Sequence, residues 1–200
     1  MKTRTFAIAL ASTALLGLAA CNQGQGNGEA PKAQTSKAAK AAGDKTIASG
    51  LAANGQFMAA AKAAGLDQTL AGPGPYTVFV PDDSAISQAP AGTFDAKPDN
   101  RAQLTGILTN MILPGTVLVA DIDKAIDNSK GKATLATMGG GTLTATKDGG
   151  KTVLTDSAGH KATITQGDDQ FSNGVVHHVD AVLMPSKTQA AKPAVGQKAG

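Results

Sequence analysis

The segment Asn173–Pro185, NGVVHHVDAVLMP, carries the strongest strand signal in the chain. Its first two residues, Asn-Gly, are a turn signal, and glycine there is free to adopt positive φ. The run from Val175 to Met184 follows and stops at Pro185. Its length and apolar content predict the longest strand, in a central position of a sheet. We expect Asp180 to accept backbone hydrogen bonds at a bend.

A second segment, Tyr76–Ile86 (YTVFVPDDSAI), has the pattern of a strand followed by a short helix. The run Val78–Val80 is typical of a strand buried on one or both faces, and Pro81 stops it. One of the next three residues is expected to cap the helix: Asp82, Asp83 or Ser84.

Apolar residues recur with helical period in the first half of the chain. One stripe lies between a capping residue, Asn54, and a helix stop, Gly65. A second stripe begins after Pro98 and ends before Pro114. A third, short helix is expected with Asp121 as its cap. The three inward faces are Phe57, Ala60, Ala61 and Ala64; Leu104, Ile107, Leu108 and Met111; and Ile122, Ala125 and Ile126.

Short runs rich in Thr, Val and Leu follow in the second half: ATLATM, GTLTATK, KTVLT and KATIT, between positions 133 and 165. Turn signals separate them at 139–141, 148–150 and 156–159. Regular short runs divided by glycine turns are typical of antiparallel hairpins. Helices followed by strands predict one α+β domain over residues 45–186, with the strands folded into a compact sandwich.

The N-terminus has the pattern of a secretory signal over residues 1–20: two positive charges, an apolar run and small residues at the exit. The apolar run is shorter than the roughly 20 residues that span a membrane. It ends in Leu18-Ala19-Ala20-Cys21, which resembles the bacterial lipobox, where the cysteine receives a diacylglyceryl group. Cys21 is the only cysteine in the chain. The alternative is an ordinary secretory signal with an incidental cysteine.

The lipid would place the mature protein on the bacterial cell envelope, facing the periplasm or the cell surface. Asn22 stands where Asp retains lipoproteins at the inner membrane, so the outer membrane is favoured. Residues 21–44 are predicted to be the lipidated cysteine and a flexible tether with a reach of about 25–30 Å, and residues 187–200 a disordered tail. Within the tether, a helix over 33–42 is an alternative, because Ala and Lys favour helix.

Composition argues against a nucleic-acid partner. The formal charge is +3, and removing Lys2 and Arg4 with the signal leaves 16 positive against 15 negative residues, or +1. The Lys and Arg residues form no cluster, aromatic residues are 3% and Trp is absent. Nucleic-acid binding needs concentrated positive charge and stacking rings.

No residue pattern indicates catalysis, a metal or a cofactor, and the protein is not expected to be an enzyme. His177 and His178 are adjacent on a strand, so they face opposite sides and cannot share one metal; one is expected to be packed and the other to face solvent. Asp168-Asp169 lacks the pattern of a calcium loop and is interpreted as a solvated turn. The chain has no Gly-x-Ser-x-Gly elbow.

The two opening segments resemble the two signature boxes of the fasciclin domain. The box residues expected to specify the fold are Thr77, Phe79, Pro81, Asp83, Asn173, Gly174, His177 and Asp180. Val80, Asp82 and Ile86 depart from the family pattern. The resemblance implies a wedge-shaped β-sandwich with helices packed along one side.

The resemblance also implies an extracytoplasmic domain that attaches to a surface, a matrix or a partner protein. Many relatives carry Tyr-His where this chain has Asn110-Met111, and animal relatives use that pair in integrin-dependent adhesion, so integrin binding is not transferred. We expect an adhesion module with a protein or polysaccharide partner. The alternatives are a passive structural envelope lipoprotein and, less favoured, a periplasmic solute-binding domain.

Overall fold

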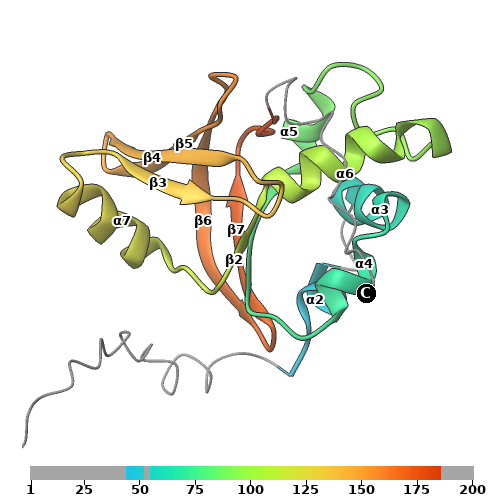
Figure 1. The fold of residues 1–200 in the computed structure, drawn as a ribbon, viewed down its shortest axis with the longest axis horizontal. Helices are drawn as coiled ribbons and strands as arrows, with labels where there is room; N and C mark the ends of the chain where they lie inside the picture. The colour runs from blue at the N-terminus through green and yellow to red at the C-terminus, as the bar shows by residue number, and fades with distance from the viewer. Residues whose placement is uncertain (1–43, 52–54, 186–200) are drawn as a thin grey trace, which may run out of the picture. The chain divides into compact units, whose positions relative to one another are not determined.

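The computed structural model describes residues 44–51 and 55–185, which form a mixed α+β fold as predicted (Figure 1). Seven strands of this part form one sheet in the order β2-β1-β7-β6-β5-β4-β3. Their bounds are β1 Tyr76–Pro81, β2 Ile112–Pro114, β3 Ala133–Ala136, β4 Thr142–Asp148, β5 Lys151–Thr155, β6 Lys161–Phe171 and β7 Gly174–Val179.

The predicted hairpins are confirmed in β3 to β6, which pair in sequence order and antiparallel. Inward residues alternate with outward ones, because successive side chains of a strand point to opposite faces. The buried ones include Leu143, Ala145, Leu154 and Ala162.

The second box forms a central strand, as predicted, but not the longest one. β7 pairs with β1 in parallel and with β6 antiparallel, and its 6 residues are fewer than the 11 of β6. It ends early because Asp180 turns the chain: Thr163 N–H donates to Asp180 Oδ1 at 2.6 Å. Beyond this bend, Met184 N–H donates to the buried carboxylate of Asp156 at 2.7 Å.

The sheet folds back on itself. β6 pairs with β5 through its first residues and with β7 through its later ones, with irregularities between Ile164 and Asp169. The two outer strands of the sheet, β2 and β3, also meet. Met138, just after β3, donates its N–H to Ile112 O of β2 at 2.7 Å. The two halves therefore lie opposite each other, as expected of a sandwich.

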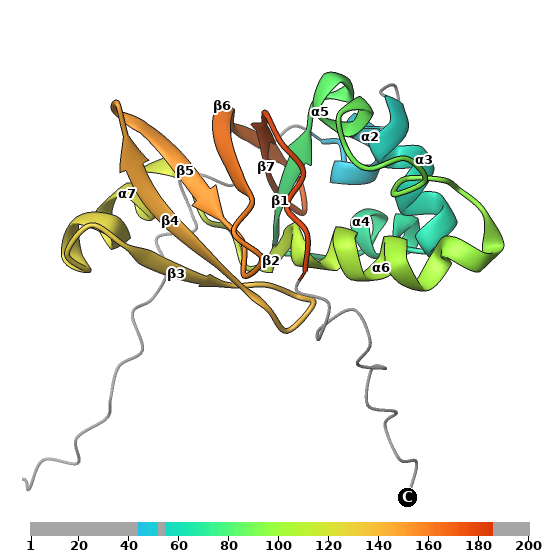
Figure 2. The same cartoon turned by 90° about the horizontal axis from the view of Figure 1, so that it is seen from above.

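Six α-helices and one 3-10 helix in the described ranges complete the fold. Helix α3 contacts α4, α5 and α6, and these form a group with α2 to one side of the sheet (Figure 2). Helix α7 packs instead on β3, β4 and β5. The bounds are α2 Ile47–Leu51, α3 Gly55–Ala64, α4 Asp67–Ala71, α5 Asp83–Ser87, η1 Pro98–Asn100, α6 Arg101–Asn110 and α7 Val119–Asn128.

The predicted helical stripes of α3 and α6 are both buried. Gly65 ends α3 with φ of +78°, which glycine adopts without steric cost, whereas the expected cap, Asn54, lies outside the described residues. The third helix begins earlier than predicted, at Val119. Asp121 therefore lies in its first turn, where Oδ2 accepts the Leu118 N–H at 3.3 Å. Ile122 and Ile126 are buried, while Ala125 is partly buried.

The signal peptide, Cys21, the tether up to residue 43 and the tail from residue 187 lie outside the described residues, so these predictions stay predictions. Among the helices that the structure describes, none has the length and apolar character needed to cross a bilayer.

Candidate binding site

The two boxes lie side by side, because β1 and β7 are neighbouring parallel strands. In their register Thr77 is opposite Val175, and Phe79 is opposite His177. The rings of Phe79 and His177 stack with centroids 5.6 Å apart and planes at 30°. Both side chains are fully buried, so this part of the boxes belongs to the core.

Asn173 joins three segments at the start of β7. Its Oδ1 accepts the Ile47 N–H at 2.8 Å, and its Nδ2 donates to Leu70 O and Gly72 O, both at 2.8 Å. The next residue is glycine because the backbones of β7 and β1 lie close together there. A Cβ on Gly174 would lie 2.0 Å from the carbonyl oxygen of Tyr76. Asn173 thereby holds α2 and the end of α4 against the sheet.

Thr77 and His177 fix the loop between β2 and α7. Thr77 Oγ1 donates to Gly115 O at 2.8 Å and accepts the Val117 N–H at 2.9 Å. His177 Nε2 lies 2.8 Å from Val117 O, and Nδ1 lies 3.0 Å from the backbone nitrogen of Asp168. Because a backbone N–H can only donate, Nδ1 is the acceptor and Nε2 carries the proton.

This pattern of hydrogen bonds matches a neutral imidazole. Burial lowers the pKa of His177, and this effect outweighs the Val117 carbonyl and the carboxylates of Asp168 and Asp169, which raise it. Both ring nitrogens are occupied by backbone groups. Among the described residues, no group of three or more His, Cys, Asp or Glu side chains is placed to hold a metal ion.

Pro81 closes β1, and the acidic residues after it do not cap their own helix as the sequence suggested. Asp82 occupies the N-cap position of α5 without a side-chain capping bond. Asp83 Oδ1 instead faces the first turn of α3, where it accepts the Gln56 N–H at 3.4 Å. A Cβ on Gly55 would lie 2.4 Å from that oxygen, so glycine makes room for the carboxylate.

The pair Asp168-Asp169 is not the solvated turn that we expected, because it lies within β6. Asp168 adopts φ of +64°, and its Oδ1 accepts the Val119 N–H at 2.9 Å, which attaches the start of α7 to the sheet. Asp169 Oδ2 lies 3.2 Å from His178 Nε2. Both carboxylates therefore organise neighbouring elements.

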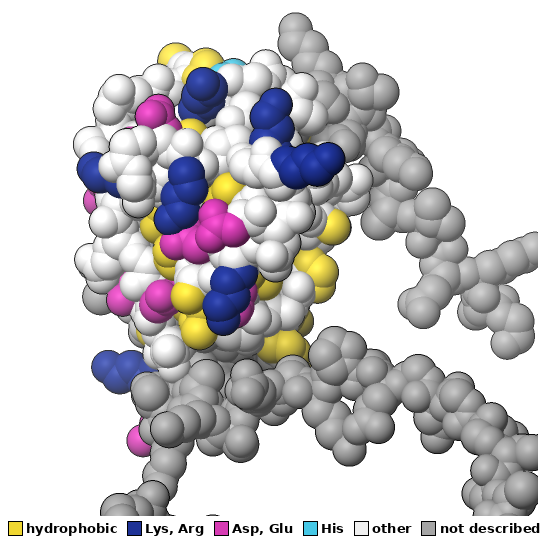
Figure 3. All heavy atoms as spheres, turned by 90° about the vertical axis from the view of Figure 1, so that its left-hand side faces the viewer, with side chains coloured by type: hydrophobic (Ala, Val, Ile, Leu, Met, Phe, Trp, Pro, Cys, Tyr) yellow, Lys and Arg dark blue, Asp and Glu magenta, His cyan; other side chains and the backbone are white. Residues whose placement is uncertain are grey.

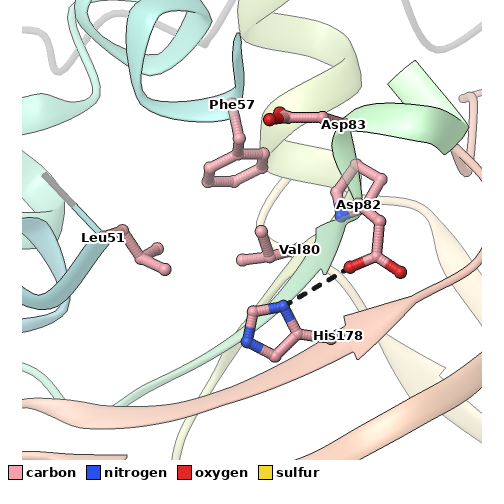
Figure 4. Close-up of a pocket in the computed structure, with 7 residues that line it drawn as sticks. Leu51, Phe57, Val80, Asp82, Asp83 and His178 are labelled. Carbon is pink, nitrogen blue, oxygen red and sulfur yellow. Dashed lines mark ion pairs between the residues drawn. The ribbon is translucent and has the colours of Figure 1, made fainter. Parts of the chain in front are cut away.

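His178 faces away from the core and lines a pocket of about 150 Å³ (Figure 4). The pocket lies between α2, α3, the end of β1 and β7, where the solvent-facing residues of the two boxes meet. Figure 4 shows Leu51 opposite Val80 and His178, with Phe57 beside them. The lining residues are Leu51, Phe57, Val80, Pro81, Asp82, Asp83 and His178.

The polar side of this pocket is acidic. His178 Nδ1 lies 3.8 Å from Asp82 Oδ1, while Nε2 faces Asp169 on its other side. Two carboxylates, those of Asp82 and Asp83, line the pocket beside the single imidazole of His178, and Asp169 lies beyond that ring. The pocket mouth therefore carries net negative charge at neutral pH.

Elsewhere in the described ranges, exposed large hydrophobic side chains are rare. Met138 is the one large hydrophobic side chain that is exposed there, at 42%. On the face viewed in Figure 3, Lys and Arg side chains are interspersed with Asp and Glu. One such pair joins α7 to β4, with Lys147 Nζ close to Asp123 Oδ2 at 2.6 Å.

Period-2 alternation predicted that one of His177 and His178 faces solvent, but nothing in the sequence marked His178 as part of a pocket or placed carboxylates around it. Asp82 follows β1 and Asp169 lies in β6, and no local pattern links either to β7.

The Asn110-Met111 pair lies elsewhere: both residues are buried, and Asn110 Nδ2 has no hydrogen-bond partner in the described part. That position is not a surface contact in this fold.

Comparison with known proteins identifies the class to which this fold and these boxes belong. The model of the Fasciclin domain family matches residues 54–185. Protein sll1483 of Synechocystis sp. is 33% identical over 147 residues, which cover 72% of this chain and 71% of that protein. The chain therefore belongs to the fasciclin domain family.

Two further relatives extend this comparison. Immunogenic protein MPB70 of Mycobacterium bovis is 31% identical over 112 residues, 56% of this chain and 51% of that protein. A solved FAS1 domain pair from the insect cell adhesion molecule Fasciclin I matches with a TM-score of 0.62 at 16% identity, over 74% of this chain and 53% of that chain. At this identity the structural match supports the fold alone.

Proposed function

We propose that this chain is a lipid-anchored binding module of the bacterial cell envelope. Its fasciclin domain docks a protein or polysaccharide partner through the surface around the pocket at His178. The observation that carries the binding role is this pocket, in which apolar walls meet carboxylates where the end of β1 lies beside His178 of β7. The inward box residues Asn173, Thr77 and His177 use their polar atoms to hold the fold together.

The size of the pocket favours docking over solute capture. Sites for drug-sized ligands enclose about 300–1,000 Å³, whereas this pocket has about 150 Å³. It can hold one side chain of a partner. Adhesion is also the role of one structural relative, Fasciclin I, which is an insect cell adhesion molecule.

The anchor in this proposal rests on Leu18-Ala19-Ala20-Cys21. Two or three acyl chains on Cys21 would hold the protein stably, since each buried CH₂ contributes about 0.8 kcal/mol. Asn22 favours delivery to the outer membrane. The tether then sets how far from the membrane the domain can reach a partner. The effective concentration of the domain at that partner is highest when the tether length matches the distance between membrane and partner.

Replacing Cys21 with Ser tests the proposal. We expect the mature protein to leave the membrane fraction, and photo-crosslinking on intact cells to lose a specific partner that the wild type captures. Ala11→Ser, a serine substitution within the signal run, serves as the control and should preserve both. Firm retention of the Cys21→Ser protein in the membrane would refute the anchor. Absence of any specific crosslink with the wild type would favour the passive structural role.

A further inference from the structure

We propose that the pocket between β1, α5 and β7 receives a lysine side chain of the partner protein. This inference rests on the proposed function, because it names the chemistry by which the domain docks. The pocket walls, its size and its charge each point to an alkyl chain that ends in a compact positive group.

The walls suit the alkyl part of such a side chain. Leu51 and Phe57 are 5% and 3% exposed and Val80 is 6% exposed, so these side chains are fixed by the core behind them. Figure 4 shows Leu51 on one side of the hollow facing Val80, with Phe57 above them and Asp82 on the far side of Val80. A cavity of about 150 Å³ holds a molecule the size of benzene, and a lysine side chain has a similar number of heavy atoms, about five beyond Cα.

The acidic side suits the ammonium group. Asp82 has a side chain that is 45% exposed, makes no capping bond to α5, and lies 3.8 Å from His178, beyond hydrogen-bond distance. Its oxygens can therefore accept N–H groups of a ligand. Among the described residues that line the pocket none is Lys or Arg, so no lysine or arginine of the lining competes for Asp82.

His178 forms the boundary of the site. Its Nε2 is engaged with Asp169 at 3.2 Å, which holds the ring between β6 and the pocket. Asp83 adds a second carboxylate at the mouth, turned toward α3. Partner side chains that are acidic would meet like charge here, and purely apolar ones would leave the Asp82 carboxylate partly desolvated without a partner.

The test is an NMR titration of the full-length chain in detergent with Nα-acetyl-lysine-N-methylamide. A single side chain in a site of this size should bind with a dissociation constant of about millimolar, and the shifts should centre on Val80, Asp82 and His178. The norleucine analogue, which has the alkyl chain but no ammonium, should bind about twofold to fivefold more weakly.

Asp82→Asn should weaken binding of the lysine probe by more than about twofold and up to about fivefold. The matched control is Asp127→Asn, the same charge change on the exposed face of α7, and it should leave the dissociation constant within about a factor of two. A thermal melt of each variant checks that the fold is kept. Shifts that centre elsewhere, equal binding of the norleucine analogue, or equal effects of the two substitutions would overturn the inference.

The outcome separates this inference from the proposed function. If the wild type crosslinks a specific partner on cells while the lysine probe does not bind the pocket, the binding module stands and the lysine site is refuted. If the probe binds in an Asp82-dependent way while no partner crosslinks, the site stands and the proposed function fails.

Discussion

His177 should make this domain sensitive to acid, and replacing it should remove that sensitivity while lowering the stability at neutral pH. The ring is fully buried, and its two nitrogens bond Val117 O and the Asp168 N–H. His177→Ala removes two hydrogen bonds, about 0.5–1.5 kcal/mol each, and leaves a cavity that adds roughly 1 kcal/mol or more. We therefore expect a loss of about 2–4 kcal/mol, equivalent to a fall in Tm of roughly 10 °C.

The pH dependence follows from the lowered pKa of His177. Burial lowers this pKa, and its effect exceeds that of the Val117 carbonyl and the nearby carboxylates, which raise it. Above the ordinary value of 6.5 the ring is neutral in both states, and its contribution to stability is complete. As the pH falls below 6.5, the unfolded chain binds a proton that the folded chain does not. The free energy of unfolding then decreases by up to about 1.4 kcal/mol per pH unit until the folded pKa is reached.

Urea denaturation at a series of pH values from 7.5 to about 4.5 measures both effects. The difference in the free energy of unfolding between wild type and His177→Ala should be largest at pH 7.5 and should shrink as the pH falls. Only in the wild type does unfolding expose this histidine to protonation. Asn128→Ala, an exposed substitution that removes no titratable group, is the control and should keep the pH profile of the wild type. A stability loss below about 1 kcal/mol, or parallel pH profiles for wild type and His177→Ala, would refute the reasoning.

Two further predictions concern the fold. Asn173→Ala should lower the free energy of unfolding by about 3 kcal/mol, since it leaves the Ile47 N–H and the carbonyls of Leu70 and Gly72 without their partner. Chemical denaturation measures this loss. A loss as small as that of the exposed Asn128→Ala would contradict the prediction. Limited proteolysis of the full chain should leave a core close to residues 45–186, and digestion of the Thr- and Gly-rich half at the rate of residues 22–44 would argue against a single cooperative domain.

The sequence alone determined those features that depend on neighbours along the chain. Helical periodicity placed the inward faces of α3 and α6, because residues three and four apart share one side of a helix. Period-2 alternation and glycine turns placed the hairpins of β3 to β6. The same alternation predicted that His177 and His178 face opposite sides of their strand. The two boxes indicated the family because each is a contiguous sequence motif, which can be recognised without knowing how the chain folds.

Tertiary structure decided the features whose partners are distant in sequence. The parallel pairing of β1 with β7 and the bond from Asn173 to Leu70, 103 positions away, have no local signature. The same holds for Asp83, which serves α3 rather than its own helix, and for Asp82 and Asp169, which meet at His178. A side chain's hydrogen-bonding capacity is a property of its residue type, whereas the group that satisfies it is set by how the elements pack.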